Sequence, residues 1–182
     1  MEINIVIGKL LYKTVGNILP DSSKGRIYRK IRGLFGRMVI CRCGINTNFG
    51  KHARFSHLVT LGDYSGIGNR AFLQGTVTIG NNVMMAEDVK IFTVNHDTSR
   101  IDIPMCEQGS QSERPVIIGD DVWIGSNVLI LPGSKIGNGV ILGAGSVVRG
   151  NIPDYAVVVG NPAEIIKFRN GQCIDETNIN NQ

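Results

Sequence analysis

A six-residue repeat constrains this chain more than any other feature of its sequence. A bulky apolar residue recurs at every sixth position in two blocks, the first from Cys43 to Ile91 and the second from Ile118 to Val148. The residue that follows is often small, as at Gly62 and Gly125. Neither a helix nor a half-buried strand produces this spacing, because their apolar periods are about 3.6 and 2 residues. The repeat therefore predicts a solenoid in which each unit packs on its neighbours.

Each hexad fits a short strand followed by a tight corner. Glycine and asparagine suit the corners because they tolerate left-handed backbone conformations. Three strands would close a triangular coil of about 18 residues, and coils stacked about 4.8 Å apart would pair as parallel strands do. A second small or β-branched residue in each hexad, such as Val59 or Val128, would also point inward. We therefore predict an all-β solenoid with a dry aliphatic core.

The composition fits one compact domain. The chain has 182 residues, 23 of them glycine, and 19% charged residues, which argues against both collagen and disorder. Its apolar runs are far shorter than the roughly 20 residues of a membrane-spanning helix, and the apolar stretch near residues 3–7 is too short for a secretory signal. We therefore expect a cytoplasmic protein. We also expect free thiols and no metal site, because no zinc-ligand spacing appears among the four cysteines, Cys41, Cys43, Cys106 and Cys173.

Three motifs carry a family resemblance. The segments Ile118-Gly-Asp-Asp-Val-Trp-Ile-Gly-Ser, Gly143-Ala-Gly-Ser-Val-Val and Val159-Gly-Asn-Pro-Ala163 resemble the hexapeptide-repeat acyltransferases, especially the branch of maltose, galactoside and polysaccharide O-acetyltransferases. The resemblance spans about residues 40–169. It implies a left-handed parallel β-helix, which is an exception to the right-handed crossover rule.

The repeat and the resemblance together divide the chain. We expect a basic, helical segment at residues 1–38 and a left-handed β-helix acyltransferase domain at residues 39–169, with about five triangular coils. An excursion loop at about residues 97–116 interrupts the repeat, and loops of this length usually have a function. We expect a short helix from Pro162 to Phe168 and a polar tail at residues 170–182.

His96 is the candidate catalytic residue, because it stands where the six-residue repeat breaks and the excursion loop begins. The sequence around it resembles the stretch that carries the catalytic histidine of the hexapeptide acetyltransferases. An alcohol attacks a thioester poorly at neutral pH, and an imidazole can accept the hydroxyl proton as the new bond forms. The resemblance thus implies direct acetyl transfer from acetyl-CoA to a hydroxyl of a sugar or saccharide, with His96 as general base and no covalent intermediate.

The resemblance also implies a wall that binds acetyl-CoA as co-substrate. Ser126, Ala144 and Pro162 are 18 residues apart, as are Trp123, Ile141 and Val159, so each set should stack along the prism. The basic residues near the end of the chain are candidates for the coenzyme phosphates. The predicted coenzyme contacts are Trp123, Ser126, Gly143, Ala144, Gly145, Arg149 and Lys167.

The acceptor site is less well determined by the sequence. Gly66 and Gln74 stand where the galactoside and maltose enzymes keep an Asn and an Asp for the sugar, which argues against a simple free sugar. A glycan subunit, a lipid-linked sugar or a nucleotide sugar fits as well. The candidate acceptor contacts lie in or beside the loop: Asn95, Asp97, Arg100, Met105 and Glu107.

Assembly and partners complete the prediction. The resemblance implies a homotrimer with its active sites between subunits. Residues 1–54 carry 11 Lys and Arg against 2 Asp and Glu, whereas the rest of the chain is acidic, so we do not expect nucleic-acid binding. Residues 1–38 fit a helix that packs on the prism with a solvated basic face. They also fit a weak peripheral contact with the inner membrane surface.

Two other functions remain open. A zinc hydratase of the γ-carbonic-anhydrase type shares the prism and needs three imidazoles, and this chain has His52, His57 and His96. Their order along the chain is the reverse of that family's pattern. The second alternative is a non-catalytic hexapeptide scaffold that binds a glycan or a partner protein through the loop.

Overall fold

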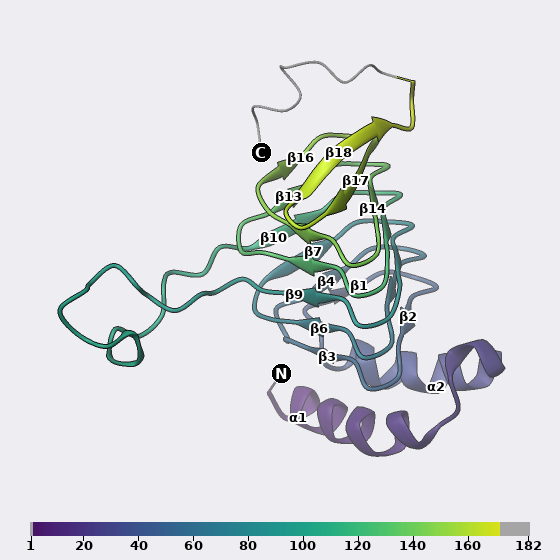
Figure 1. Ribbon diagram of the computed structural model, residues 1–182. Coiled ribbons are helices and arrows are strands. Elements are labelled where there is room, and N and C mark those ends of the chain that lie inside the picture. Colours follow the sequence, from purple (N-terminus) through teal and green to yellow (C-terminus); the bar gives the residue numbers. More distant parts are fainter. Residues whose placement is uncertain (1, 172–182) are drawn as a thin grey trace.

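The strands wind into a three-faced prism with two helices packed under one end (Figure 1). The structure is a computed structural model, and it describes residues 2–171. Within each face, a strand pairs in parallel with the strand of the next coil, as Leu61 does with Ile79, 18 residues further on. The predicted β-solenoid is therefore present. The first face runs through six coils, one more than predicted.

The strands alternate between the faces in chain order. The first face contains β1 (Arg42–Cys43), β4 (Thr60–Leu61), β7 (Val77–Ile79), β10 (Val116–Ile118), β13 (Lys135–Ile136) and β16 (Asn151–Ile152). The second contains β2 (Asn48–Phe49), β5 (Gly66–Ile67), β8 (Met84–Met85), β11 (Trp123–Ile124), β14 (Ile141–Leu142), β17 (Ala156–Gly160) and β18 (Ala163–Phe168). The third contains β3 (Arg54–Phe55), β6 (Phe72–Leu73), β9 (Lys90–Ile91), β12 (Leu129–Ile130) and β15 (Val147–Val148).

The core is the predicted aliphatic column. Bulky apolar residues of the six-residue repeat, such as Ile67 and Ile124, have no exposed surface. The second inward residues of the hexads, such as Val89 and Val128, have none either. Removing so much apolar surface from water is the main favourable term of the fold, at about 25 cal/mol per Å². Most inward positions are aliphatic or small, with Phe49 and Phe55 as aromatic exceptions at the end that the helices cover, so polar chemistry is concentrated on the outer faces and the corners.

A ladder of side-chain hydrogen bonds holds the corner between the first and second faces. In each coil an Asp or Asn oxygen accepts a hydrogen bond from a backbone N–H of the coil before it, as Asn138 Oδ1 does from Asp120 N at 2.8 Å. This satisfies backbone donors that the turn leaves unpaired. The residues of the ladder are Asp63, Asn81, Asp120, Asn138 and Asp154.

The N-terminal helices cover the first coil, in agreement with the predicted helical segment. The segment consists of α1 (Glu2–Leu11), the π-helical turn η1 (Tyr12–Gly16), the 3₁₀ turn η2 (Ser22–Lys24) and α2 (Arg26–Arg37). Tyr12 packs edge-on against Phe49 and Phe55 and donates a hydrogen bond to Gly50 O. Gly36 lies so close to Phe49 that a Cβ on it would come within 2.5 Å of the ring.

Burial raises the pKa of Tyr12 far above its usual value, so this buried hydroxyl stays protonated and able to donate.

The C-terminal end differs from the prediction. The segment expected as a helix is the strand β18, which runs antiparallel to β17 and closes the top of the second face. Its alternating burial, with Ile165 turned inward and Ile166 exposed at 50%, fits a strand on a half-covered face. A helix would have left the top edge of β17 unpaired. The predicted polar tail falls largely outside the described residues.

Candidate functional site

His96 lies at the root of a long hairpin that leaves the prism after β9 and returns at β10. The stem is held by backbone hydrogen bonds from Asp97 N to Gly109 O at 3.1 Å and from Gln111 N to Asn95 O at 2.9 Å. His96 forms an isolated antiparallel bridge with Ser110 between these two bonds. The backbone at this position is therefore defined, and the imidazole is exposed.

Glu113 fastens the returning strand of this hairpin to the prism. Its Oε1 accepts a hydrogen bond from Thr76 N, and it lies beside Thr93. The Thr76 backbone N–H lowers the pKa of Glu113, with a smaller contribution from the Thr93 side chain. This anchoring role of Glu113 follows from the fold, because Thr76 and Glu113 are far apart in the chain.

The predicted acceptor residues divide into two groups. Asn95 and Asp97 flank His96 on the stem, and Asp97 Oδ1 accepts a hydrogen bond from Ser99 N at 2.9 Å, which lowers the pKa of that carboxyl. Arg100 instead pairs with Asp102 at the tip. Met105 and Glu107 occupy the turn η3 (Met105–Glu107), also at the tip.

Figure 1 shows this tip projecting well away from the prism. Within one chain, the tip residues are not brought to the coenzyme wall.

The predicted coenzyme wall lies on the second face and on the corner that follows it. Trp123 pairs with Ile141 as predicted, and it is 51% exposed. Gly145 N donates to Ser126 O at 2.8 Å, so the predicted stack of Ser126 under Ala144 is also present. A Cβ on Gly145 would meet no atom within 4 Å, and Ala144 is exposed. The corner is thus an open strip of small side chains and backbone that fits a thin, flexible arm such as pantetheine.

The stack ends differently from the prediction, because the last coil is two residues shorter. Ile136 pairs with Ile152, and Ile141 therefore pairs with Val157 rather than with Val159. Gly143 N correspondingly donates to Val158 O. Pro162 does not continue the row of Ser126 and Ala144, because it follows β17 in the turn to β18.

The two predicted phosphate-binding cations lie on different parts of the prism. Lys167 is exposed on β18, at the end of the second face, and is in register with Val157. Arg149 follows β15 and is exposed at the corner between the third and first faces. That is also the corner from which the His96 hairpin departs. The same chain therefore carries His96 and Arg149 on one corner, and Ser126 and Ala144 on another.

A polar cleft of about 500 Å³ adjoins the row at Ser126, between the second face and the N-terminal segment. Residues of the N-terminal segment, Asp21 and Arg29 among them, form one wall. Asn48 lines the opposite wall, and its Oδ1 is a buried atom with no hydrogen-bond partner among the described residues. An unpaired buried acceptor is costly. Reasoning from the sequence did not find this cleft, because its walls are 19 to 105 residues apart in the chain.

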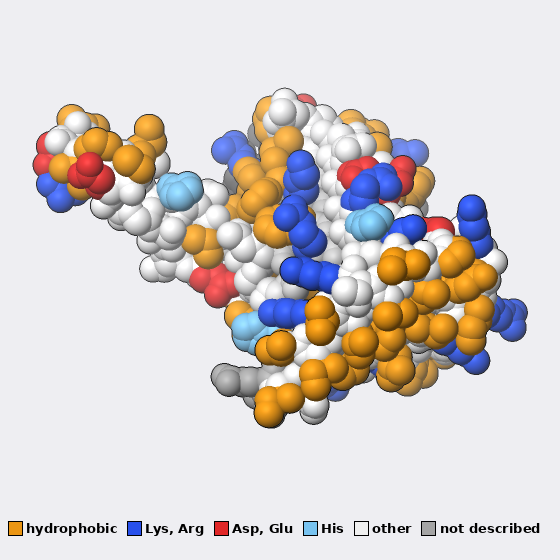
Figure 2. Space-filling model, turned by 90° about the horizontal axis from the view of Figure 1, so that it is seen from below, with side chains coloured by type: hydrophobic (Ala, Val, Ile, Leu, Met, Phe, Trp, Pro, Cys, Tyr) orange, Lys and Arg blue, Asp and Glu red, His pale blue; other side chains and the backbone are white. Residues whose placement is uncertain are grey.

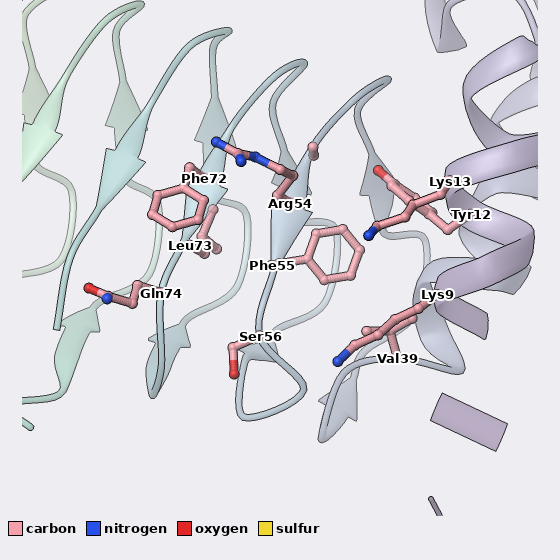
Figure 3. Close-up of a pocket in the computed structure, with 11 residues that line it drawn as sticks. Lys9, Tyr12, Lys13, Val39, Arg54, Phe55, Ser56, Phe72, Leu73 and Gln74 are labelled. Atoms are coloured by element: carbon pink, nitrogen blue, oxygen red, sulfur yellow. The ribbon is translucent and has the colours of Figure 1, made fainter. Parts of the chain in front are cut away.

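A second, more apolar pocket of about 350 Å³ lies between α1 and the third face (Figure 3). Lys9 and Lys13 approach it from the helix, and the rings of Phe55 and Phe72 line the prism side. The Arg54 guanidinium stacks over the Phe72 ring at 4.8 Å from its centroid. None of the predicted site residues lines this pocket.

The three histidines do not form a metal site in the structure. His52 lies in the corner after β2, His57 in the corner after β3, and His96 on the hairpin stem. No group of three or more His, Cys, Asp or Glu side chains in residues 2–171 is placed to hold a metal ion. The arrangement thus gives no support to the zinc hydratase. Cys41, Cys43 and Cys106 are free thiols, and Cys173 lies outside the described residues.

The sequence and the structure both resemble known acetyltransferases. The family described as bacterial transferase hexapeptide (six repeats) matches residues 115–150. WbbJ of Escherichia coli (strain K12), described as a candidate lipopolysaccharide biosynthesis O-acetyl transferase, is 41% identical over 122 residues, which are 64% of this chain and 60% of WbbJ. The chain spans about half the length of the curated relatives it matches.

Solved structures match over more of the chain. A maltose O-acetyltransferase from Clostridium difficile 630 is 32% identical, with a TM-score of 0.75 over 91% of this chain and 86% of that one. A galactoside acetyltransferase in complex with coenzyme A is 27% identical, with a TM-score of 0.76 over 92% and 81%. These matches confirm the predicted left-handed parallel β-helix.

Proposed function

Because this chain belongs to the hexapeptide-repeat acyltransferase family, we propose that it is an acetyl-CoA-dependent O-acetyltransferase acting on a hydroxyl of a sugar or saccharide. The names of its relatives support both substrates, since they include galactoside and maltose O-acetyltransferases and a complex with coenzyme A. Acetyl-CoA would be a co-substrate that supplies an activated thioester. The proposal requires no metal.

The position of His96 carries the proposal. The hairpin root and the small-residue row of Ser126 and Ala144 lie on different corners of the prism, with the third face between them. A single chain therefore holds two separate halves of a site. Two chains packed side by side would join the hairpin of one to the row of the other, and a closed ring of three copies would do this three times. We accordingly propose a homotrimer with its active sites between subunits.

The chemical step would be direct transfer. His96 accepts the proton of the acceptor hydroxyl while that oxygen attacks the thioester carbonyl carbon, and the C–O bond forms. The tetrahedral intermediate then collapses, the C–S bond breaks, and the proton passes from the imidazolium to the leaving thiolate. General-base assistance of this kind contributes about 10²- to 10⁴-fold. Holding both reactants in one site between two subunits would contribute more, because it removes the entropy cost of their encounter.

The coenzyme would lie along the row on the second corner. Its pantetheine arm fits against the backbone and small side chains of Ser126, Gly143, Ala144 and Gly145, beside the half-exposed indole of Trp123. Lys167 at the end of the same face is available to the phosphates. Arg149 would reach the phosphates only from a neighbouring subunit.

The polar cleft next to Ser126 is the best place for the acceptor. A sugar offers many hydroxyl groups, and the cleft is lined by amide, hydroxyl and charged residues, Asn48 among them. Asp21 and Arg29 add charged hydrogen-bonding groups to the opposite wall. The hairpin of a neighbouring subunit, with Asn95, Asp97, Arg100, Met105 and Glu107, would cover this cleft.

A CoA-release assay with a panel of saccharide acceptors tests the proposal. We expect acceptor-dependent release that falls by about 10²- to 10⁴-fold in His96→Ala. His57→Ala is the matched control, since it removes an exposed imidazole from the prism wall, and it should retain the wild-type rate.

The outcomes separate the three functions. Acceptor-dependent release that is unaffected by His96→Ala would exclude His96 as the base. Glycan binding without turnover would favour the scaffold. Loss of a zinc-dependent CO₂ hydration activity in both variants would favour the hydratase.

A further inference from the structure

Helix α1 turns an apolar stripe toward solvent. Ile3, Val6, Ile7 and Leu10 are spaced as i, i+3, i+4 and i+7, so they share one side of the helix. Their side chains are 43% to 75% exposed. In a helix of a soluble domain this stripe would normally face the core.

The opposite side of α1 is the one that packs on the protein. Gly8 is buried so tightly that a Cβ on it would lie 2.6 Å from Met38 Cβ, and Tyr12 at the helix end inserts between the aromatic rings of the first coils. Rotating α1 to bury its stripe would break both contacts. The outward orientation of the stripe is therefore built into the packing.

Neighbouring segments extend the stripe into a broader surface, which we call the basal apolar surface. It consists of Ile3, Val6, Ile7, Leu10, Ile18, Ile27 and Leu34, each at least 43% exposed. Figure 2 shows hydrophobic side chains gathered over the helices at this end of the molecule, with Lys and Arg beside them. A contiguous exposed apolar surface of this kind usually marks a protein or membrane interaction site.

The charges around the surface are almost all positive. Seven cations of the segment are exposed: Lys9, Lys13, Lys24, Arg26, Arg29, Lys30 and Arg37. The one acidic residue between positions 3 and 37 is Asp21, whose carboxylate already accepts hydrogen bonds from Ser23 N and Asn69 Nδ2. A second copy that presented the same surface would be repelled by these charges. An anionic partner would be attracted.

We propose that the basal apolar surface docks on an anionic lipid bilayer, with α1 lying in the plane of the interface. Apolar side chains would enter the boundary between headgroups and acyl chains, and exposed cations of α2 such as Arg26 and Lys30, which neighbour Ile27 and Leu34 on that helix, would meet the lipid phosphates. Among residues 2–171, no helix is long and apolar enough to cross a bilayer, so the contact is peripheral. The prism would then stand on the membrane, with the second-face cleft close to the lipid headgroups.

Vesicle co-sedimentation of the full chain tests this proposal without using acetyl transfer. One set of vesicles is pure phosphatidylcholine, and the other contains about one-third phosphatidylglycerol. We expect the protein to pellet with the anionic vesicles, to stay in solution with the neutral ones, and to bind less as the salt concentration rises.

Two variants separate the apolar and charged contributions. Val6→Asn with Leu10→Asn should weaken binding about tenfold or more, because these side chains no longer favour the acyl region. Arg26→Gln with Lys30→Gln should reduce the preference for anionic vesicles. Ile166→Asn is the matched control, since it removes a half-exposed aliphatic side chain at the other end of the prism.

Three results would overturn the proposal. The first is no pelleting with either vesicle set. The second is equal binding by wild type and both double variants. The third is that the wild type does not bind either vesicle set, while Val6→Asn with Leu10→Asn lowers the mass of the assembly measured by light scattering. That result would assign the surface to contacts between copies of the chain. The first two results do not depend on acetyltransferase activity, whereas a loss of assembly in the third would also lower that activity, because the proposed active sites lie between subunits.

Discussion

The Glu113 carboxylate accepts a hydrogen bond from the Thr76 backbone N–H and so joins the end of the His96 hairpin to the coil beneath it. Thr76 immediately precedes β7, which pairs directly with β10, the strand that the hairpin leads into. The side chain therefore acts where a 20-residue excursion must return in register with the repeat.

Glu113→Gln should loosen the hairpin root and leave the prism intact. The substitution removes the charge from an exposed, charge-assisted hydrogen bond, so we expect a loss of about 0.5–1 kcal/mol in the local stability of the stem. Hydrogen exchange at the stem amides of Gln111 and Arg114 measures this opening. Unchanged exchange in the variant would show that backbone pairing alone holds the stem.

The same contact predicts a pH dependence. The pKa of Glu113 is lowered in the folded protein, so its contribution is complete above its unfolded pKa of about 4.3 and is lost as the pH falls through the folded value. Stem exchange, corrected for the intrinsic rate, should therefore increase below about pH 4 in the wild type. Glu113→Gln should not show this step.

Asn48→Ala should separate stability from acceptor binding. The variant removes a buried, unpaired acceptor, so the free energy of unfolding should stay within about 1 kcal/mol of wild type or rise. The KM for the acceptor should increase about five- to tenfold, because a polar side chain that lines the proposed acceptor cleft is removed. Steady-state kinetics measure the KM for the acceptor, and denaturant titration measures the free energy of unfolding. A large loss of stability with an unchanged KM would assign Asn48 a structural role.

Ala144→Glu should impair coenzyme binding selectively. The side chain is exposed on the small-residue row, so the fold should tolerate a larger residue. A carboxylate on the row would block the arm and repel the coenzyme phosphates, and the KM for acetyl-CoA should rise about tenfold or more. Ala144→Ser keeps the row small and should leave this KM within about twofold. Equal KM values for both variants would place the coenzyme elsewhere.

Arg32→Met should destabilise the N-terminal segment. The Arg32 side chain is fully buried and donates hydrogen bonds to Gly16 O at 3.0 Å, Pro20 O at 2.9 Å and Ser22 Oγ at 2.7 Å. Methionine would remove these hydrogen bonds from a buried position and leave Gly16 O, the buried acceptor, unpaired, which should cost about 3 kcal/mol in denaturant unfolding. Arg26→Met is the control, since Arg26 is exposed and should change stability by less than about 0.5 kcal/mol. Equal effects would mean that water replaces the Arg32 contacts.

Arg32 also illustrates where the sequence misleads. In the sequence it is one of eight cations in a basic segment, and nothing in its spacing separates it from Arg29 or Lys30. The structure buries it because the turn between the helices aims three backbone carbonyls at one point. The C-terminal strand is a comparable case. Ala163 to Phe168 has no strong local preference, and the unpaired edge of β17 makes it a strand.

The hexad spacing alone determined the solenoid, the stacking of Trp123 on Ile141 and of Ser126 under Ala144, and the point at which the His96 excursion begins. These are local consequences, because each coil repeats the same short-range rule against its neighbour. Tertiary structure alone decided the shorter last coil, the cleft beside Asn48, the anchoring of Glu113 and the outward stripe of α1. The shorter last coil departs from the repeat, so its register is set by the strand pairing of the closing coil. The other three depend on groups far apart in the chain meeting in space, and such meetings are set by packing.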